Sequence, residues 1–228
     1  MNALRSLAQR DVRPTIAQLQ EEGRYISLIE FGLLFDAALE AFDGEDRTRS
    51  NALMLQALVY LGIAARYFAP NRPGVLRVMS VTAGCISPTC RDADCQGNYV
   101  APNGHLHVKH DKTEASHGPR PPLPCPEPLR ALLEHWLGWG RALVRGNTRD
   151  TGALFLYPTT GASMTEGQSS AFMPLALRLI SGDDRHITAT AVRPRPRGHL
   201  LPRTLRSRSL RAADAPLTGR CCARLGRR

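Results

Sequence analysis

One stretch in the first third of the chain is apolar on more than one side of the helix that its spacing predicts. It begins at about Arg47 and ends before Pro70, because proline cannot continue a helix. Its apolar residues are Leu53, Leu55, Leu58, Val59, Leu61, Ile63 and Ala64. A helix without one continuous polar face has to be surrounded by other elements, so we expect this one near the centre of the core.

Three further helices are predicted around it. Apolar residues recur at helical spacing over 29–42, before a glycine, and again over 129–137. A later helix is predicted to begin at a capping box formed by Ser163 and Glu166. Pro174 lies inside that helix and predicts a kink or a late start.

A β-hairpin is predicted over residues 98–110. Asn103 and Gly104 lie between two alternating runs, which is the strongest short-range hairpin pattern. Alternation places Leu106 and Val108 on one face. The opposite face, which we expect to point to solvent or to a ligand, carries His105, His107 and Lys109.

These elements predict a mainly α fold with a small antiparallel β-hairpin or sheet, which is the α+β class. Residues 75–81 suit either a short helix or a strand, and residues 153–157 predict a short strand that ends at Pro158. We expect three parts: an N-terminal segment over 1–24, one domain over 25–193, and a disordered arginine-rich tail over 194–228.

The positive charge is concentrated in the C-terminal part of the sequence. The formal net charge is +10, and residues 193–228 account for it with eleven arginines and one acid, Asp214. The preceding residues carry 19 basic and 19 acidic side chains. The basic balance therefore does not by itself indicate a nucleic-acid-binding face on the folded part.

The same composition excludes some classes of protein. No apolar run reaches the roughly 18 to 20 residues that a membrane-spanning helix requires. The first residues, 1–13, carry three arginines and no apolar stretch, which does not fit a secretory signal. We therefore expect an intracellular protein.

Three cysteines follow one another at even spacing: Cys85, Cys90 and Cys95. In an intracellular chain such cysteines are thiols or metal ligands more often than disulfides. They could supply three thiolates to a structural zinc ion, with a fourth ligand from His105, His107, His110 or Cys125. The alternative interpretation is a loop with three reduced cysteines.

Three cationic residues occur at junctions between the expected elements. Arg72 follows the long apolar helix, Lys112 ends the hairpin, and Arg193 closes the run 187–193. A guanidinium can donate two parallel hydrogen bonds to phosphate oxygens, and an ammonium on a flexible stem can act as a general acid. The plain alternatives are a solvated charge at a helix end, a surface lysine and the first residue of the basic tail.

With these residues in this order, the chain over 25–193 resembles the catalytic domain of tyrosine recombinases, the phage-integrase-like enzymes, and especially versions from algal mobile elements. The resemblance implies DNA recombination or integration through a 3′-phosphotyrosyl link, without a metal or another cofactor for catalysis. It implies that Arg72 and Arg193 bind the phosphate and that Lys112 protonates the leaving 5′-oxygen. It also implies double-stranded DNA as the partner, allows copies of the chain to assemble on DNA, and implies a nuclear location.

The sequence departs from the pattern of that family. Val75 stands where the family has an acidic residue, and Thr190 stands where it has a histidine. The nucleophilic tyrosine should follow Arg193, but the last tyrosine is Tyr157. We therefore expect a catalytically incomplete DNA-binding domain, or a shifted reading frame after Arg193. The alternatives are a non-catalytic, zinc-stabilised nucleic-acid-binding module and a non-functional gene fragment.

Overall fold

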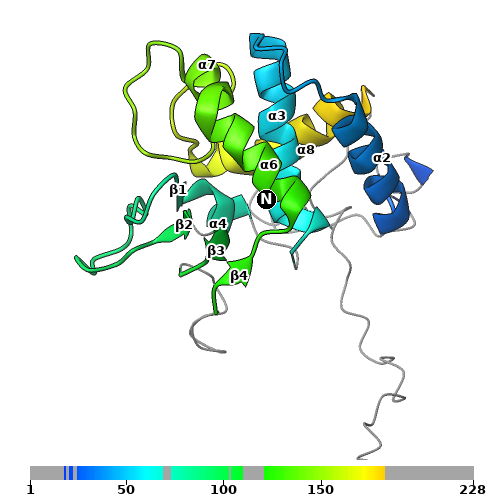
Figure 1. Cartoon of the computed structure of the whole chain (residues 1–228). Coiled ribbons are helices and arrows are strands. Elements are labelled where there is room, and N and C mark those ends of the chain that lie inside the picture. The colour runs from blue at the N-terminus through cyan, green and yellow to red at the C-terminus, as the bar shows by residue number, and fades with distance from the viewer. Residues whose placement is uncertain are drawn as a thin grey trace, which may run out of the picture. The chain divides into compact units, whose positions relative to one another are not determined.

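The computed structural model describes Gln18, residues 21–22, and residues 25–68, 73–102, 104–109 and 121–182. The chain divides into two units, Met1–Pro194 and Arg195–Arg228, and every element described below belongs to the first unit. That unit is mixed α+β, with several helices and one small sheet (Figure 1). Within the described ranges, none of the helices is long and apolar enough to span a membrane.

The helices and strands follow one another in a simple order. The helices are α2 (Leu28–Ala41), α3 (Arg49–Leu61), α4 (Pro73–Arg77), α6 (Glu127–His135), α7 (Arg141–Arg145) and α8 (Glu166–Ser181). Two π-helical turns, η1 (Gly62–Arg66) and η2 (Trp136–Gly140), continue α3 and α6. The strands are β1 (Met79–Ser80), β2 (Asn98–Val100), β3 (His105–His107) and β4 (Leu123–Pro124).

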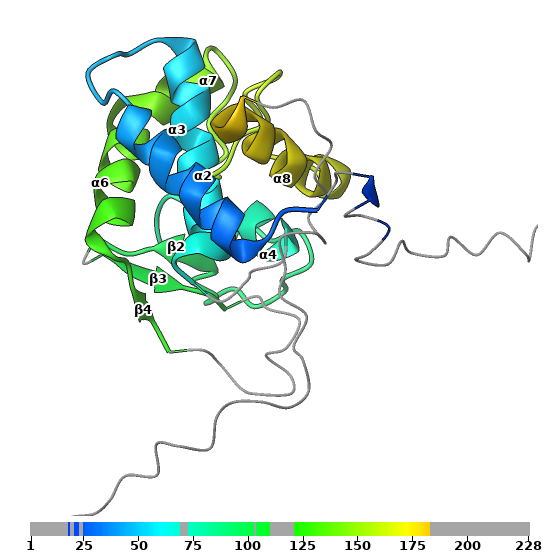
Figure 2. The same ribbon diagram turned by 90° about the vertical axis from the view of Figure 1, so that its right-hand side faces the viewer.

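Helix α3 lies at the centre of the helical part, as its apolar sequence predicted. Thr48 begins the helix by accepting a hydrogen bond from the Asn51 backbone N–H, and residues 55–61 are all buried. The helix contacts α2, α6, α7, η2 and α8. Figures 1 and 2 both show it between α6 on one side and α8 on the other. One polar side chain on it, Gln56, is also fully buried.

The sheet contains the predicted hairpin. Strands β2 and β3 pair antiparallel, with Tyr99 opposite His107, and β3 pairs antiparallel with β4. The predicted alternation is confirmed, since Leu106 and Val108 are buried while Lys109 is exposed. The segment 75–81, for which helix and strand were both open, contains the end of α4 and then β1. Because β1 pairs parallel with β2, the sheet is mixed, whereas an antiparallel sheet was expected.

The expected strand over 153–157 does not form a regular strand. Its bridges are isolated, between Ala153 and Ser80 and between Leu156 and Ser163. Its backbone is instead satisfied by side chains from three helical elements. Gln56 donates to the Leu156 carbonyl (3.0 Å) and accepts from the Leu156 N–H (2.9 Å), Trp136 Nε1 donates to the Leu154 carbonyl (2.9 Å), and Arg141 Nε donates to the Ala153 carbonyl (2.8 Å).

The residues predicted to cap the last helix are wrong. Helix α8 begins with a capping box made by Thr165 and Gln168, not by Ser163 and Glu166. The Ser163 backbone is already paired with Leu156, so the helix starts two residues later. Pro174 lies inside α8 without delaying its start.

Leu137 does not lie on the buried stripe of α6, although its spacing predicted this. Its side chain is 44% exposed, while Trp136 beside it is fully buried. The π-helical turn η2 begins at Trp136, and a π-helical turn changes the number of residues per turn. The phase of the apolar stripe therefore shifts at this point.

Asp150 is held by two arginines next to the buried 153–156 segment. Arg141, which is 8% exposed, donates two hydrogen bonds to its carboxylate, and Arg145 donates another. The hydrogen bonds from Arg141, together with one from the Gly152 N–H, lower the pKa of Asp150 well below its usual range. The buried guanidinium therefore has a full counter-charge at neutral pH.

Replacing Asp150 with asparagine should make stability less sensitive to acid. A carboxyl with a lowered folded-state pKa stabilises the fold above its unfolded pKa of about 4, and this stabilisation is lost as the pH falls below that value. We expect the wild type to be more stable than Asp150→Asn by about 1 to 2 kcal/mol at pH 7, with the difference shrinking below about pH 4. Urea unfolding at pH 7, 4 and 3 measures this.

The matched control is Asp36→Asn, which removes a pair with Arg66 on the surface. Its partners are more exposed, so a change of less than about 1 kcal/mol is expected. Equal effects of the two variants, or a difference that grows as the pH falls, would contradict the role given to Asp150.

Candidate functional site

The three cationic residues singled out in the sequence, Arg72, Lys112 and Arg193, lie outside the described residues. The structure describes the segments that flank the first two. Helix α4 begins at Pro73, directly after Arg72, and the described part of the hairpin ends at Lys109. The structure therefore bears on this candidate phosphate site through the positions of the segments that flank Arg72 and Lys112.

A buried asparagine joins the two flanking segments. The side chain of Asn98, at the start of β2, is fully buried. Its amide N–H donates to the Val75 carbonyl (3.1 Å), and its amide oxygen accepts from the Lys109 N–H (2.7 Å). In the sequence, Arg72 precedes Val75 by three residues, and Lys112 follows Lys109 by three residues. A stretch of three residues spans at most about 11 Å.

Helix α8 is tied to the same place. Ser169, which is buried, donates its hydroxyl hydrogen bond to the Pro73 carbonyl (2.7 Å). Helices α4 and α8 are in contact. Helix α4 is thus tied to the hairpin through Val75 and to the N-terminal half of α8 through Pro73.

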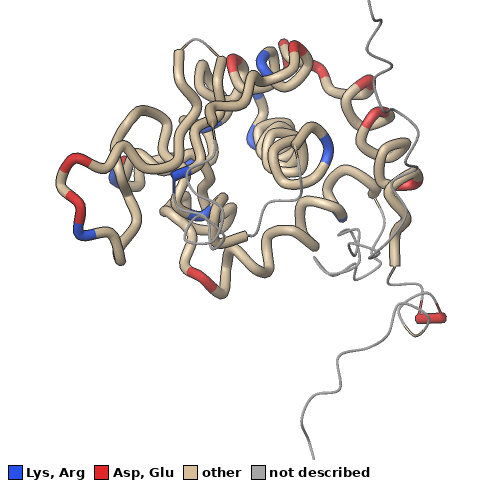
Figure 3. The backbone as a smooth tube through the Cα atoms, turned by 90° about the horizontal axis from the view of Figure 1, so that it is seen from below, with Lys and Arg blue, Asp and Glu red and all other residues tan. Residues whose placement is uncertain are grey.

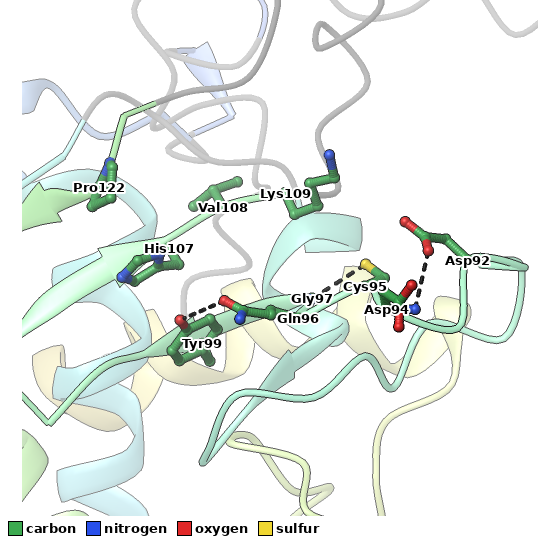
Figure 4. A pocket seen from close by; sticks show the side chains of 10 residues that line it. All are labelled: Asp92, Asp94, Cys95, Gln96, Gly97, Tyr99, His107, Val108, Lys109 and Pro122. Carbon is green, nitrogen blue, oxygen red and sulfur yellow. Dashed lines mark hydrogen bonds between the residues drawn. The ribbon is translucent and has the colours of Figure 1, made fainter.

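A small cavity opens between the hairpin and the loop that precedes it. Its volume is about 290 Å³. Figure 4 shows Lys109 and Cys95 at one end of it and His107 and Pro122 at the other. The rings of His107 and Tyr99 are stacked, 4.5 Å apart and 9° from parallel. Of the two histidines expected to face solvent or a ligand, His107 lines this cavity.

The three evenly spaced cysteines come together in the loop over residues 81–97, which we call the cysteine loop. The sulfur atoms of Cys85, Cys90 and Cys95 all lie within 4.8 Å of one another. Zinc–sulfur bonds of about 2.3 Å in a tetrahedral site put sulfur atoms about 3.8 Å apart. The triad is thus close enough to bind a metal ion after small side-chain movements.

The backbone brings the two ends of the cysteine loop into contact. The Gly84 N–H donates to the Gln96 carbonyl (2.8 Å). Gly97 has a positive φ of 70°, and a Cβ added there would lie 2.8 Å from the Cα of Cys85. This close crossing requires glycine, and it places Cys85 beside Cys95, ten residues away in the sequence.

The thiols of the triad have different environments. A backbone hydrogen bond at Asp92 lowers the pKa of the half-buried Cys90 thiol. Burial raises the pKa of Cys95 to about 11, although the Gly97 N–H donates to its sulfur (3.3 Å) and opposes this. A bound metal cation would lower the pKa of Cys95 and so oppose the effect of burial, because thiols that coordinate a metal are deprotonated.

The fourth ligand suggested by the sequence is not found in the described residues. His105, His107 and Cys125 are not part of the close group, and His110 lies outside the described residues. Burial raises the pKa of Cys125 to about 11, so it is an uncharged thiol at neutral pH. The described donor set is therefore three thiols.

Charge is unevenly distributed over the described surface. Acidic residues recur along α2 and the connection that follows it, as Figure 3 shows. They are Glu30, Asp36, Glu40, Asp43, Glu45 and Asp46. Phosphate groups would be repelled from this side. On the hairpin side, the cavity is lined by Lys109 and also by Asp92 and Asp94.

Asn98 and Ser169 were not singled out from the sequence. Each is a single polar residue in an otherwise ordinary strand or helix, and its partners are remote in the chain. A single sequence contains no pattern that identifies such residues. No family model, curated protein or solved structure matches this chain.

Proposed function

We propose that residues 25–193 are the DNA-binding domain of a recombination or integration protein of the tyrosine recombinase type, without its nucleophile. The observation that carries the proposal is the double hydrogen bond of the buried Asn98 side chain to Val75 and Lys109. It draws together the segments that lead to Arg72 and Lys112. The order of the helices and the hairpin supports the same interpretation.

In this proposal the cationic residues bind one phosphate of double-stranded DNA. Arg72 and Arg193 donate hydrogen bonds to the non-bridging oxygens, and Lys112 lies near the 5′-oxygen. Because no tyrosine follows Tyr157, the expected outcome is binding without strand cleavage. The DNA approaches the side of α4 and the hairpin, away from the acidic residues of α2. Several copies on one DNA and a nuclear location belong to the same proposal.

Substitution of the two cationic residues next to the described framework tests this proposal. In the full chain, Arg72→Gln and Lys112→Gln should each weaken binding to a short duplex about 10-fold, measured by fluorescence anisotropy at fixed salt. Each should also reduce the slope of log affinity against log salt by about 1, because one phosphate contact is lost.

The control for net charge is Arg47→Gln, which removes an exposed arginine before α3. It should change the affinity less than about 2-fold. An equal loss for all three variants would contradict the proposal, since it would show attraction by net charge alone. A covalent adduct with a nicked suicide duplex would contradict the absence of a nucleophile.

We further propose that Cys85, Cys90 and Cys95 bind a structural zinc ion. The closeness of these cysteines favours the second candidate function, a zinc-stabilised nucleic-acid-binding module. The three sulfur atoms within 4.8 Å support it. Three thiolates and one further ligand form a common structural zinc set. When bound, such an ion would hold the cysteine loop closed beside the hairpin, and it takes no part in a reaction.

Metal analysis tests the zinc site. Protein purified without chelators should contain about one zinc per chain, and Co²⁺ substitution should give a thiolate-to-cobalt charge-transfer band. Cys90→Ser should lose both signals, while Cys125→Ser should keep both. Metal content near zero in the wild type, with no cobalt band, would refute the site.

A further inference from the structure

Arg77 is a half-buried arginine in the described structure, and one of its three guanidinium nitrogens has no hydrogen-bond partner. Arg77 is the last residue of α4, and its Nε atom is buried with no hydrogen-bond partner. The paired arginines in the described ranges include Arg66, Arg130, Arg141 and Arg145, each with a carboxylate. A buried donor without a partner is unfavourable, so an acceptor that reached this Nε–H would be bound favourably.

Arg77 lines a cavity of about 290 Å³. Its polar lining includes Thr151 and Ser163, and its apolar wall includes Val78, Ile86 and Met164. None of the described lining residues carries a carboxylate. At about 30 Å³ per water molecule, the cavity has room for roughly ten waters, and so for a phosphate group with a few of them.

The charges near the cavity do not cancel that of Arg77. Asp150 precedes Thr151 in the chain, but its carboxylate is already held by Arg141 and Arg145. The cavity walls come from three separate segments: α4 with β1, the cysteine loop, and the connection between α7 and α8. A ligand there would therefore contact parts of the chain that are remote in sequence.

We propose that this cavity is a binding site for a phosphate group. The planar guanidinium of Arg77 donates two parallel hydrogen bonds to two phosphate oxygens, which is the arrangement that arginine makes with phosphate. The hydroxyls of Thr151 and Ser163 donate to the remaining oxygens. The apolar side chains of the wall strengthen these charged hydrogen bonds by lowering the local dielectric constant. The site shares no residue with the proposed DNA site and does not depend on it.

Binding of inorganic phosphate to the full chain tests the site. Titration calorimetry, at an ionic strength kept constant with chloride, should show one saturable site in the wild type. Arg77→Gln should raise the Kd at least 10-fold, because the bidentate donor is lost. Arg47→Gln removes the same charge from an exposed position and should leave the Kd within 2-fold.

A second variant keeps the test valid if Arg77→Gln unfolds. The double variant Thr151→Val with Ser163→Ala leaves the arginine in place and should raise the Kd about 3- to 10-fold, through loss of two neutral hydrogen bonds. No saturable phosphate binding by the wild type, or the same Kd in the wild type and in the folded variants, would overturn the proposal.

Competition identifies the source of the phosphate group. If a short DNA duplex displaces inorganic phosphate from the wild type, the site takes a phosphodiester of the nucleic-acid backbone; if it does not, the site takes a free phosphate ion. Both results support a phosphate site. Failure of this proposal would appear as phosphate binding that Arg77→Gln does not weaken, whereas failure of the DNA proposal would appear as duplex binding that Arg72→Gln does not weaken, so the two failures are distinguishable.

Discussion

Replacing Gln56 with leucine is expected to lower the free energy of unfolding by about 3 kcal/mol, although the substitution puts an apolar side chain into an apolar core. The Gln56 amide satisfies both the N–H and the carbonyl of Leu156. Leucine would leave both groups buried without partners, at about 1 to 3 kcal/mol for each group, while its own burial offsets part of this. Chemical denaturation at neutral pH measures the difference.

Gln56→Glu separates hydrogen bonding from size at the same position. A protonated glutamic acid can donate to one Leu156 group and accept from the other, but a carboxylate can only accept. Burial raises the folded-state pKa of such a carboxyl, so the loss of stability should be largest at neutral pH and should shrink as the pH falls towards 4. A pH-independent loss, or a loss below about 1 kcal/mol for Gln56→Leu, would contradict the role of Gln56.

Replacing Asn98 with alanine should have a comparable effect and should reach the proposed DNA site. It removes the donor to the buried Val75 carbonyl and the acceptor of the part-buried Lys109 N–H, and we expect a loss of about 3 kcal/mol. If α4 and the end of the hairpin are then no longer held together, the affinity for duplex DNA should also fall about 10-fold under conditions where the variant stays folded.

Tyr99→Phe is the matched control for Asn98. It removes the neighbouring hydroxyl, whose acceptor is the exposed Gln96 side chain. We expect less than about 0.5 kcal/mol and no change in DNA affinity. Wild-type DNA affinity in a folded Asn98→Ala protein would show that the Asn98 junction does not position the DNA site.

The parts of the fold predicted from the sequence are those with a local pattern. The central helix followed from its apolar composition, and the hairpin followed from Asn103 and Gly104 between alternating runs. The prediction that Leu137 is buried was wrong because a π-helical turn changes the spacing of the residues that face the core. The predicted capping box was wrong because the Ser163 backbone pairs with Leu156, which lies outside the four residues that define the capping-box pattern.

The residues of the candidate sites also differ in whether a local sequence pattern identifies them. The even spacing of Cys85, Cys90 and Cys95 allowed either a metal-ligating set or a loop of reduced cysteines, and the structure brings the three thiols close together. Asn98 and Arg77 carry no local pattern, because what distinguishes them is the burial of a polar group against remote segments. Such roles depend on tertiary packing, which a single sequence does not state.

The side-chain hydrogen bonds to residues 153–156 also bear on solubility. The run Ala-Leu-Phe-Leu-Tyr over 153–157 has the apolar, uncharged composition of segments that stack into cross-β aggregates. Gln56, Trp136 and Arg141 occupy its backbone groups, and the Leu154 N–H is bonded to the Met79 carbonyl. Most of the backbone groups that could pair with a second molecule are then already bonded, so partial unfolding that releases them should be the step that precedes precipitation.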